Sequence, residues 1–195
     1  RTPEGLYSPE YAVVDQKEEF EVRRYASYAV CSARMSERGE TKLNDNAGAS
    51  RTTAGSGEGF NTLAGYLFGN NTSERAMSMT TPVNIDVSPT AGRTMSFIMP
   101  KDIPAGAAPV PNDPRVGVRD VAEGETLAVR EFPGFATDGE VRRQVDALLT
   151  ALEREQQPSA AWRAEDPSGR SYRLMQFNPP YTLPWLRTNA VAVQV

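Results

Sequence analysis

The sequence predicts an α+β fold in which two strand-helix-strand halves share one antiparallel β-sheet and pack their helices on its outside. Three observations predict this class. Short segments rich in aromatic and β-branched residues recur along the chain, separated by polar turns. Two segments have the apolar periodicity of an amphipathic helix, and each lies between groups of such strands. A similar residue pattern also occurs once in each half of the chain.

The first half begins with a predicted β-hairpin. Residues 11–14 and 20–25 are rich in aromatic and β-branched residues, and the polar residues between them are typical of a turn. Residues 28–35 continue as a third strand. Two more strands of this half are predicted at residues 84–87 and 94–99.

A polar and glycine-rich stretch, residues 36–59, follows the third strand, and Leu43 is its one large apolar residue before the helix. Such a segment buries too little surface to offset the entropy of ordering it, so we expect a mobile loop insertion. Its GSGEG run lacks the Lys-Ser/Thr pair of a phosphate-binding loop. We therefore interpret the run as flexible chain.

Residues 59–68 have helical spacing of apolar side chains, and Gly69 and Asn70 provide a helix end. The sequence therefore predicts a short helix. Its apolar stripe consists of Phe60, Leu63, Ala64 and Leu67.

The proline-rich residues 100–114 connect the two halves. In the second half, Thr137 and Glu140 form a capping-box signal for a helix. Its apolar face consists of Val141, Val145, Leu148, Leu149 and Leu152. Strands are predicted at residues 116–121, 126–132, 172–177 and 190–195. We expect residues 1–195 to form a single domain.

The repeated pattern is V-R-x-aromatic-x-x-aromatic-A, at residues 22–29 and 129–136. Each copy is followed by a predicted helix and then by a proline-containing segment. The two proline-containing segments are residues 80–83 and 178–181. The order suggests a duplicated unit, although V-R-aromatic also recurs by chance in strands. In a duplicated fold, a groove between a helix and the facing proline-containing loop would be a natural ligand site.

The composition excludes several classes of function. The chain has no histidine, which excludes Ser-His-Asp and Cys-His catalysis, His-ligated zinc and a proximal histidine on haem iron. The single Cys31 excludes an intrachain disulfide and a multi-cysteine metal site. The net charge of -4 is spread without blocks of like charge, so we expect no nucleic-acid surface.

No apolar run approaches the ~20 residues that cross a bilayer, so we expect a soluble protein without a transmembrane segment. No charged and then apolar leader opens the chain. Because numbering starts at Arg1, we expect a processed or trimmed form.

Two methionines, Met77 and Met79, point to the same side of an extended chain. Their polarizable side chains suit a large flat apolar ligand, and methionine is also ordinary core filler. Tyr66 and Cys31 are the other candidates for iron ligation. Their alternatives are a packed tyrosine ring and an inert buried thiol.

The segment NPPYTLPWLRTNAV, residues 178–191, lies between two predicted strands. This position argues against a disordered proline-rich peptide ligand. We interpret it as a stiff loop that positions Tyr181, Trp185 and Arg187. Arg187 would hold a carboxylate ligand at the edge of an aromatic wall, or lie over an aromatic ring.

The chain resembles the SOUL haem-binding protein family. The resemblance rests on EVRRYASYAV, FNTLAGYLFGNN followed by MSMTTPV, MSFIMP, PVPNDPRV, AVREFPGFA and YRLMQFNPPYTLPWLRTNAV, which occur in the family's order. It implies a distorted antiparallel β-barrel or sheet built from two related halves, with a long helix in each.

The resemblance also implies non-covalent binding of haem or a related tetrapyrrole in an apolar cleft beside the first helix. Carried over by position, the cleft-lining residues are Phe60, Leu63, Ala64, Leu67, Met77, Met79, Tyr181, Trp185 and Arg187. No metal ligand and no catalytic residue is implied.

We therefore expect a tetrapyrrole carrier or buffer rather than an enzyme. Two alternatives are open. One is a protein-interaction or structural subunit that has lost haem binding, which the absence of Lys and Arg from residues 57–66 favours. The other is an enzyme that removes or modifies the metal of a tetrapyrrole. Resemblance to plant and algal members suggests a plastid location, with the cytoplasm as the alternative.

Overall fold

The computed structural model describes residues 5–35, 56–155, 171–179 and 181–195. The predicted loop lies outside these residues up to position 55, and so does Pro180. The helices are α1 (Ser56–Leu67) and α2 (Asp138–Arg154), with short 3-10 turns η2 (Ala105–Ala107) and η3 (Pro184–Leu186). The strands are β1 (Tyr11–Gln16), β2 (Glu21–Tyr25), β3 (Tyr28–Arg34), β4 (Val83–Ser88), β5 (Gly92–Ile98), β6 (Val116–Val121), β7 (Thr126–Pro133), β8 (Tyr172–Gln176) and β9 (Thr188–Gln194).

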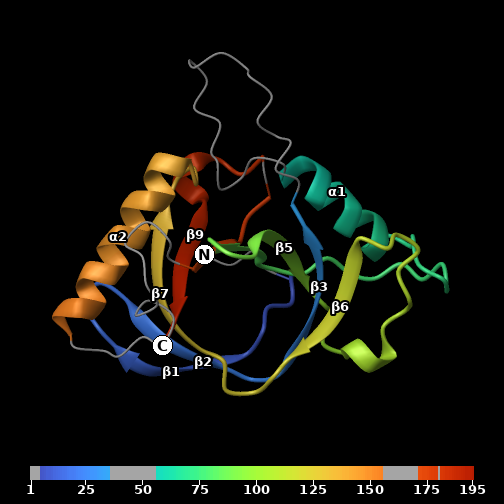
Figure 1. Cartoon of the computed structure of the whole chain (residues 1–195), viewed down its shortest axis with the longest axis horizontal. Helices are drawn as coiled ribbons and strands as arrows, with labels where there is room; N and C mark the ends of the chain where they lie inside the picture. The colour runs from blue at the N-terminus through green and yellow to red at the C-terminus, as the bar shows by residue number, and fades with distance from the viewer. Residues whose placement is uncertain (1–4, 36–55, 156–170, 180) are drawn as a thin grey trace, which may run out of the picture.

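All nine strands join one antiparallel sheet in the order β1-β2-β7-β9-β8-β4-β5-β3-β6. The sheet curls into a partly closed barrel, with α1 and α2 on its outside (Figure 1). Helix α1 packs against β3, β5 and β6, and α2 packs against β7 and β9. The predicted α+β class and the external helices are confirmed.

The strand order is symmetric about the β4·β8 pair. Outward from β4 the order is β5, β3 and β6, and outward from β8 it is β9, β7 and β2. Helix α1 connects β3 to β4, and α2 connects the corresponding strands β7 and β8. Each half also contributes one strand, β2 or β6, to the edge of the other half. The chain is therefore built from two pseudo-repeated halves.

The repeated residue pattern does not mark equivalent positions in these halves. Its two copies fall in β2 and β7, which are neighbours in the sheet, whereas the counterpart of β7 is β3. Val22 faces the helices and Tyr25 the barrel interior, but Val129 faces the interior and Phe132 the helices. Side chains alternate between the two faces of a strand. Corresponding residues of the two copies therefore lie on opposite faces of the sheet. The two copies thus lie in non-equivalent strands, and using the pattern as a repeat marker was wrong.

The core has two layers, one on each face of the sheet. The outer layer contains both helices, including Leu63, Leu67, Leu148 and Leu152, against side chains of the sheet. The inner face carries aromatic and aliphatic residues such as Tyr28, Ile98 and Met175. Because both faces are covered, most strands lack the alternation of a half-exposed sheet.

The two helices differ in how well their starts were predicted. Helix α2 begins after Thr137, whose hydroxyl accepts a hydrogen bond from the Glu140 amide at 3.3 Å, as the capping box predicted. Helix α1 begins at Ser56, three residues before the predicted start at Gly59. Glu58 lies in its first turn, where a carboxylate is favourable beside the helix N-terminus. None of the described helices is long and apolar enough to cross a membrane.

Candidate functional site

The apolar stripe of α1 faces the sheet. Leu63 and Leu67 are 0% exposed and Ala64 is 8% exposed, because they pack in the outer layer of the core. Phe60 is partly exposed, and its ring centroid lies 5.1 Å from that of Phe97 on β5. Phe60 is therefore the stripe residue that retains appreciable surface.

The segment after α1 runs beside the helix. The Met77 amide donates a hydrogen bond to the Leu67 carbonyl at 2.7 Å, which holds this segment against the end of α1. Met77 is buried, and Met79 is partly buried against the outer core layer. Both methionines contribute to packing, and Met79 is the more accessible of the two.

The loop between β8 and β9 presents large side chains to solvent. Tyr181 is 87% exposed and Trp185 is 73% exposed. The exposed apolar residues in and beside this loop are together called the terminal-loop patch. They are Phe135, Tyr181, Leu183, Trp185 and Leu186. Exposed apolar groups of this size commonly mark a ligand or protein interaction surface.

Arg187 fastens the terminal-loop patch to the β7–α2 turn. Its guanidinium carbon lies 4.7 Å from the centre of the Phe135 ring, and its Nε donates to the Thr182 carbonyl at 2.8 Å. The structure therefore shows the cation above an aromatic ring, one of the two arrangements expected for Arg187. The Thr188 amide donates to Asn178 Oδ1 at 2.7 Å and holds the base of the loop.

The predicted site residues form two groups joined by one segment. Helix α1 lies against β3, β5 and β6, whereas η3 of the terminal loop contacts β7. The segment with the two methionines leads from α1 to the end of β8, just before the terminal loop, because the Thr81 hydroxyl donates to the Phe177 carbonyl at 2.9 Å. This contact follows from the pairing of β4 with β8, in which Val83 lies opposite Gln176.

Two other candidates for iron ligation are buried. The Tyr66 hydroxyl donates to the Pro109 carbonyl at 2.8 Å, and burial raises its pKa to about 12. Cys31 is 0% exposed, and burial raises the pKa of its thiol to about 12. Neither residue presents an anionic ligand at neutral pH. No group of three or more His, Cys, Asp or Glu that suits a metal ion occurs within the described part of the chain.

Burial of Cys31 leads to a prediction about its reactivity. A thiol reacts as the thiolate, so we expect the native protein to react with a disulfide reagent more than about 100-fold more slowly than the urea-unfolded chain. The release of thionitrobenzoate from Ellman's reagent measures both rates. Similar rates in the two states would contradict the burial of Cys31.

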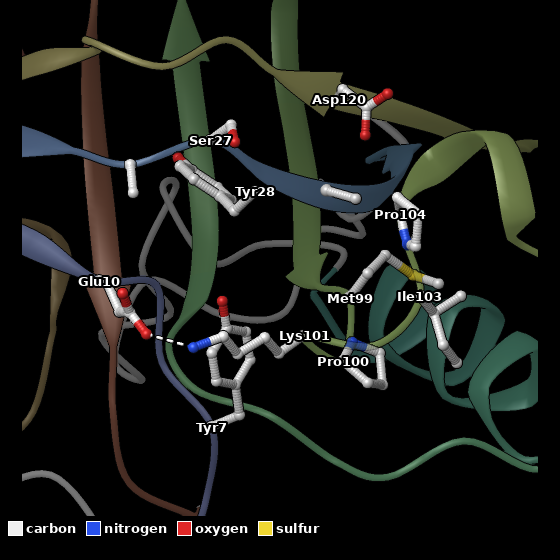
Figure 2. A pocket seen from close by; sticks show the side chains of 12 residues that line it. Tyr7, Glu10, Ser27, Tyr28, Met99, Pro100, Lys101, Ile103, Pro104 and Asp120 are labelled. Atoms are coloured by element: carbon white, nitrogen blue, oxygen red, sulfur yellow. Dashed lines mark hydrogen bonds and ion pairs between the residues drawn. The ribbon is translucent and has the colours of Figure 1, made fainter.

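A hollow with a volume of about 440 Å³ lies elsewhere on the barrel (Figure 2). Tyr7, Lys101 and Asp120 are among the residues that line it. None of the residues predicted for the tetrapyrrole cleft contributes to it. It is therefore separate from the terminal-loop patch.

The protein-family model described as SOUL heme-binding protein matches residues 6–194 of the chain. The chain belongs to the SOUL heme-binding protein family. Comparison with curated protein sequences finds no significant match.

Two solved structures share the SOUL-family fold of this chain. A hydrolase from Listeria innocua has a TM-score of 0.56 and 11% identity, covering 92% of this chain and 93% of its own. An uncharacterized conserved protein from Listeria innocua has a TM-score of 0.59 and 11% identity, covering 91% and 92% respectively. At this identity the likeness concerns the fold alone.

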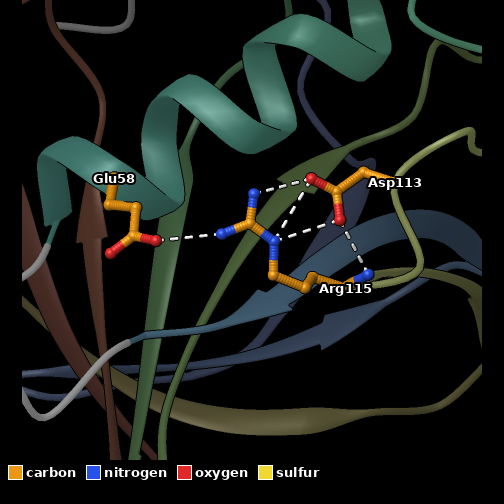
Figure 3. Close-up of polar contacts among 3 residues, drawn as sticks. All are labelled: Glu58, Asp113 and Arg115. Carbon is orange, nitrogen blue, oxygen red and sulfur yellow. Dashed lines mark hydrogen bonds and ion pairs between the residues drawn. The ribbon is translucent and has the colours of Figure 1, made fainter.

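The structure supplies this SOUL-family chain with a cation beside α1 that local sequence reasoning missed. Arg115, just before β6, places Nη1 2.9 Å from Glu58 Oε1 in the first turn of α1 (Figure 3). Its Nη2 lies 2.7 Å from Asp113 Oδ2, and Arg115 lowers the pKa of Asp113 to about 2. Because β6 pairs with β3, on which α1 packs, a distant residue reaches the helix start.

Proposed function

We propose that the protein binds haem or a related tetrapyrrole non-covalently and acts as a carrier or buffer. The observation that carries this proposal is the match of the SOUL heme-binding family model to residues 6–194. The residue set fits such a ligand, because the terminal-loop patch offers exposed aromatic surface to a flat apolar ring.

The proposed site uses the predicted residues in different ways. Tyr181 and Trp185 would form its accessible aromatic wall, and Arg187, which lies over the Phe135 ring, would supply a cation for a ligand carboxylate. Phe60 and Met79 are the partly buried residues that contribute from the α1 side. Leu63, Ala64, Leu67 and Met77 support the site from within the core.

Stacking of the macrocycle, rather than strong iron ligation, should dominate affinity. The chain has no histidine, and the hydroxyl of Tyr66 and the thiol of Cys31 are both buried and protonated. We therefore expect metal-free protoporphyrin to bind within about tenfold of haemin, because both offer the same flat apolar face and carboxylates.

Titration of the purified protein with haemin and protoporphyrin, followed by absorbance, tests the proposal. Truncating an aromatic anchor at a binding surface commonly costs more than about 1 kcal/mol. The double variant Tyr181→Ala, Trp185→Ala should therefore lose at least about tenfold in affinity. Val110→Ala removes exposed apolar surface outside the patch and serves as the control. The proposal fails if no saturable Soret change occurs at micromolar protein.

A protein-interaction role is the second candidate, and the same patch favours it. Aromatic residues are enriched at protein interfaces, and Tyr181 and Trp185 are exposed here. Native mass spectrometry of freshly purified protein distinguishes the two functions. A stoichiometric protein partner without a bound chromophore would support interaction, and a coloured monomer would argue for the carrier.

A further inference from the structure

The hollow lies where four segments distant in sequence meet. These segments are the chain before β1, the β2–β3 turn with the start of β3, the connection after β5, and β6, which carries Asp120 (Figure 2). The Ala26 amide donates to the Glu10 carbonyl at 2.9 Å, and the Met99 amide donates to the Ala29 carbonyl at 2.8 Å. The volume of the hollow, about 440 Å³, falls within the range of roughly 300–1,000 Å³ typical of small-molecule sites.

One wall of the hollow is apolar and firmly held. Met99 and Ile103 are almost fully buried, and both belong to the outer core layer that also contains α1. The Ile103 amide donates to the Pro100 carbonyl at 2.9 Å, which closes the turn that carries Pro104. Tyr7 faces this wall from the other side (Figure 2). The buried side chains of Met99 and Ile103 hold the wall in place, and the exposed Pro104 offers apolar surface to a ligand.

The charged residues of the hollow are Glu10, Lys101 and Asp120. Lys101 Nζ lies 2.5 Å from Glu10 Oε1, so this pair balances its own charge. Asp120 lies across the hollow from the pair (Figure 2), and its Oδ1 accepts a hydrogen bond from the Ala105 amide at 3.0 Å. Within the described ranges, no Lys or Arg forms an ion pair with Asp120. The hollow therefore carries one unbalanced negative charge.

We infer that this hollow binds a small amphipathic molecule with an ammonium group. Its apolar body would pack against Met99, Pro100 and Pro104, and its ammonium would bind the carboxylate of Asp120. A carboxylate beside an apolar wall complements such a molecule, because an ammonium both balances the charge and donates charge-assisted hydrogen bonds. A carboxylate ligand would instead bring a third carboxylate into a hollow that already holds Glu10 and Asp120 with the single cation of Lys101. The inference is independent of tetrapyrrole binding.

Three probes that differ only in their polar group test this inference. They are 2-phenylethylammonium, 2-phenylethanol and 3-phenylpropionate, each titrated into the labelled full chain and followed by amide chemical shifts in NMR. The ammonium probe should give saturable shifts in residues that line the hollow, and the other two should bind about two- to fivefold more weakly. Asp120 is exposed, and an exposed ion pair contributes roughly 0.5–1 kcal/mol, which corresponds to this difference.

Variants of the full chain locate the ammonium group. Asp120→Asn keeps a side-chain oxygen for the Ala105 amide but removes the charge, so affinity for the ammonium probe should fall about two- to fivefold. Glu123→Gln makes the same charge change at an exposed residue outside the hollow and should leave binding unchanged. The double variant Tyr181→Ala, Trp185→Ala should also bind the ammonium probe normally, which separates this result from the tetrapyrrole proposal.

Three results would overturn the inference. The first is the absence of saturable shifts at millimolar concentrations of the ammonium probe. The second is binding of that probe with unchanged affinity to Asp120→Asn. The third is preferential binding of 3-phenylpropionate that Lys101→Met abolishes, which would assign the hollow to an anionic ligand.

Discussion

Replacing Arg173 with methionine is expected to lower the free energy of unfolding by about 3–5 kcal/mol, the usual cost of removing one partner from a buried ion pair. Arg173 lies on β8 with its side chain 13% exposed. Its Nε lies 2.7 Å from Asp86 Oδ1, and its Nη2 lies 3.1 Å from Glu125 Oε1. The Tyr28 hydroxyl also donates to Glu125 Oε2 at 2.7 Å. Methionine would leave both carboxylates without their cation.

The loss should depend on pH. Burial raises the pKa of Glu125, but the charge of Arg173 and the hydrogen bonds from Arg173 and Tyr28 outweigh burial and lower it below its ordinary value. A lowered native pKa gives stability that is fully present above the unfolded pKa of about 4.3 and is lost as pH falls through the native pKa. Without Arg173, burial dominates, and protonation of Glu125 relieves the variant. The deficit should therefore be larger at pH 7 than at pH 4.

Urea unfolding of the wild type and Arg173→Met at both pH values measures these effects. Arg142→Met replaces an exposed arginine of α2 and should change stability by less than about 0.5 kcal/mol. Adding Glu125→Gln to Arg173→Met should recover part of the loss, because it removes a carboxylate left without its partner. A loss below about 1 kcal/mol at pH 7 would show that the ion pairs contribute little.

Local signals in the sequence predicted individual elements well. The stripe of α2 and its cap at Thr137 lie within one segment, and both predict the helix without reference to the rest of the fold. The order of strands depends instead on contacts between distant residues. β3 follows β2 in the chain but pairs with β5 and β6, and no local signal specifies that choice.

The interior of the barrel was missed for a related reason. No local sequence signal marked Arg173 as buried, yet it contacts the hydroxyl of Tyr28 on the inner face and lies two residues before the inner-face Met175 on β8. Asn84 and Ser96 lie opposite each other on the same side, and both are nearly fully buried. The curled sheet thus buries these polar residues among the aromatic and aliphatic side chains of its inner face, and a two-residue period alone cannot distinguish a buried polar residue from an exposed one.

The candidate site was also only partly predictable from local sequence patterns. Periodicity predicted that Leu63 and Leu67 share one apolar face, but it did not distinguish a sheet from a ligand as the partner of that face. The proline-rich loop was a better predictor of accessible surface, since its prolines and flanking strands place Tyr181 and Trp185 in solvent. Arg115 and Glu58 meet across 57 positions of sequence, beyond any local pattern.

Leu63→Asp is expected to unfold the protein, with a loss of more than about 5 kcal/mol. Leu63 is 0% exposed between α1 and the sheet. Removing a buried leucine costs roughly 2–5 kcal/mol, and burying a carboxyl group without a partner adds further cost. The sum is comparable with the whole stability of a typical domain, about 5–15 kcal/mol.

Asn61→Asp provides the matched control, because it introduces the same carboxylate on the exposed side of α1 and should change stability by less than about 0.5 kcal/mol. Circular dichroism during thermal unfolding measures both variants. Loss of tetrapyrrole binding in Leu63→Asp would then report loss of the fold, whereas the same loss in a folded Tyr181→Ala, Trp185→Ala variant would report the site. If Leu63→Asp instead unfolds cooperatively near the wild-type temperature, the stripe of α1 is not held against the sheet and is available to a ligand.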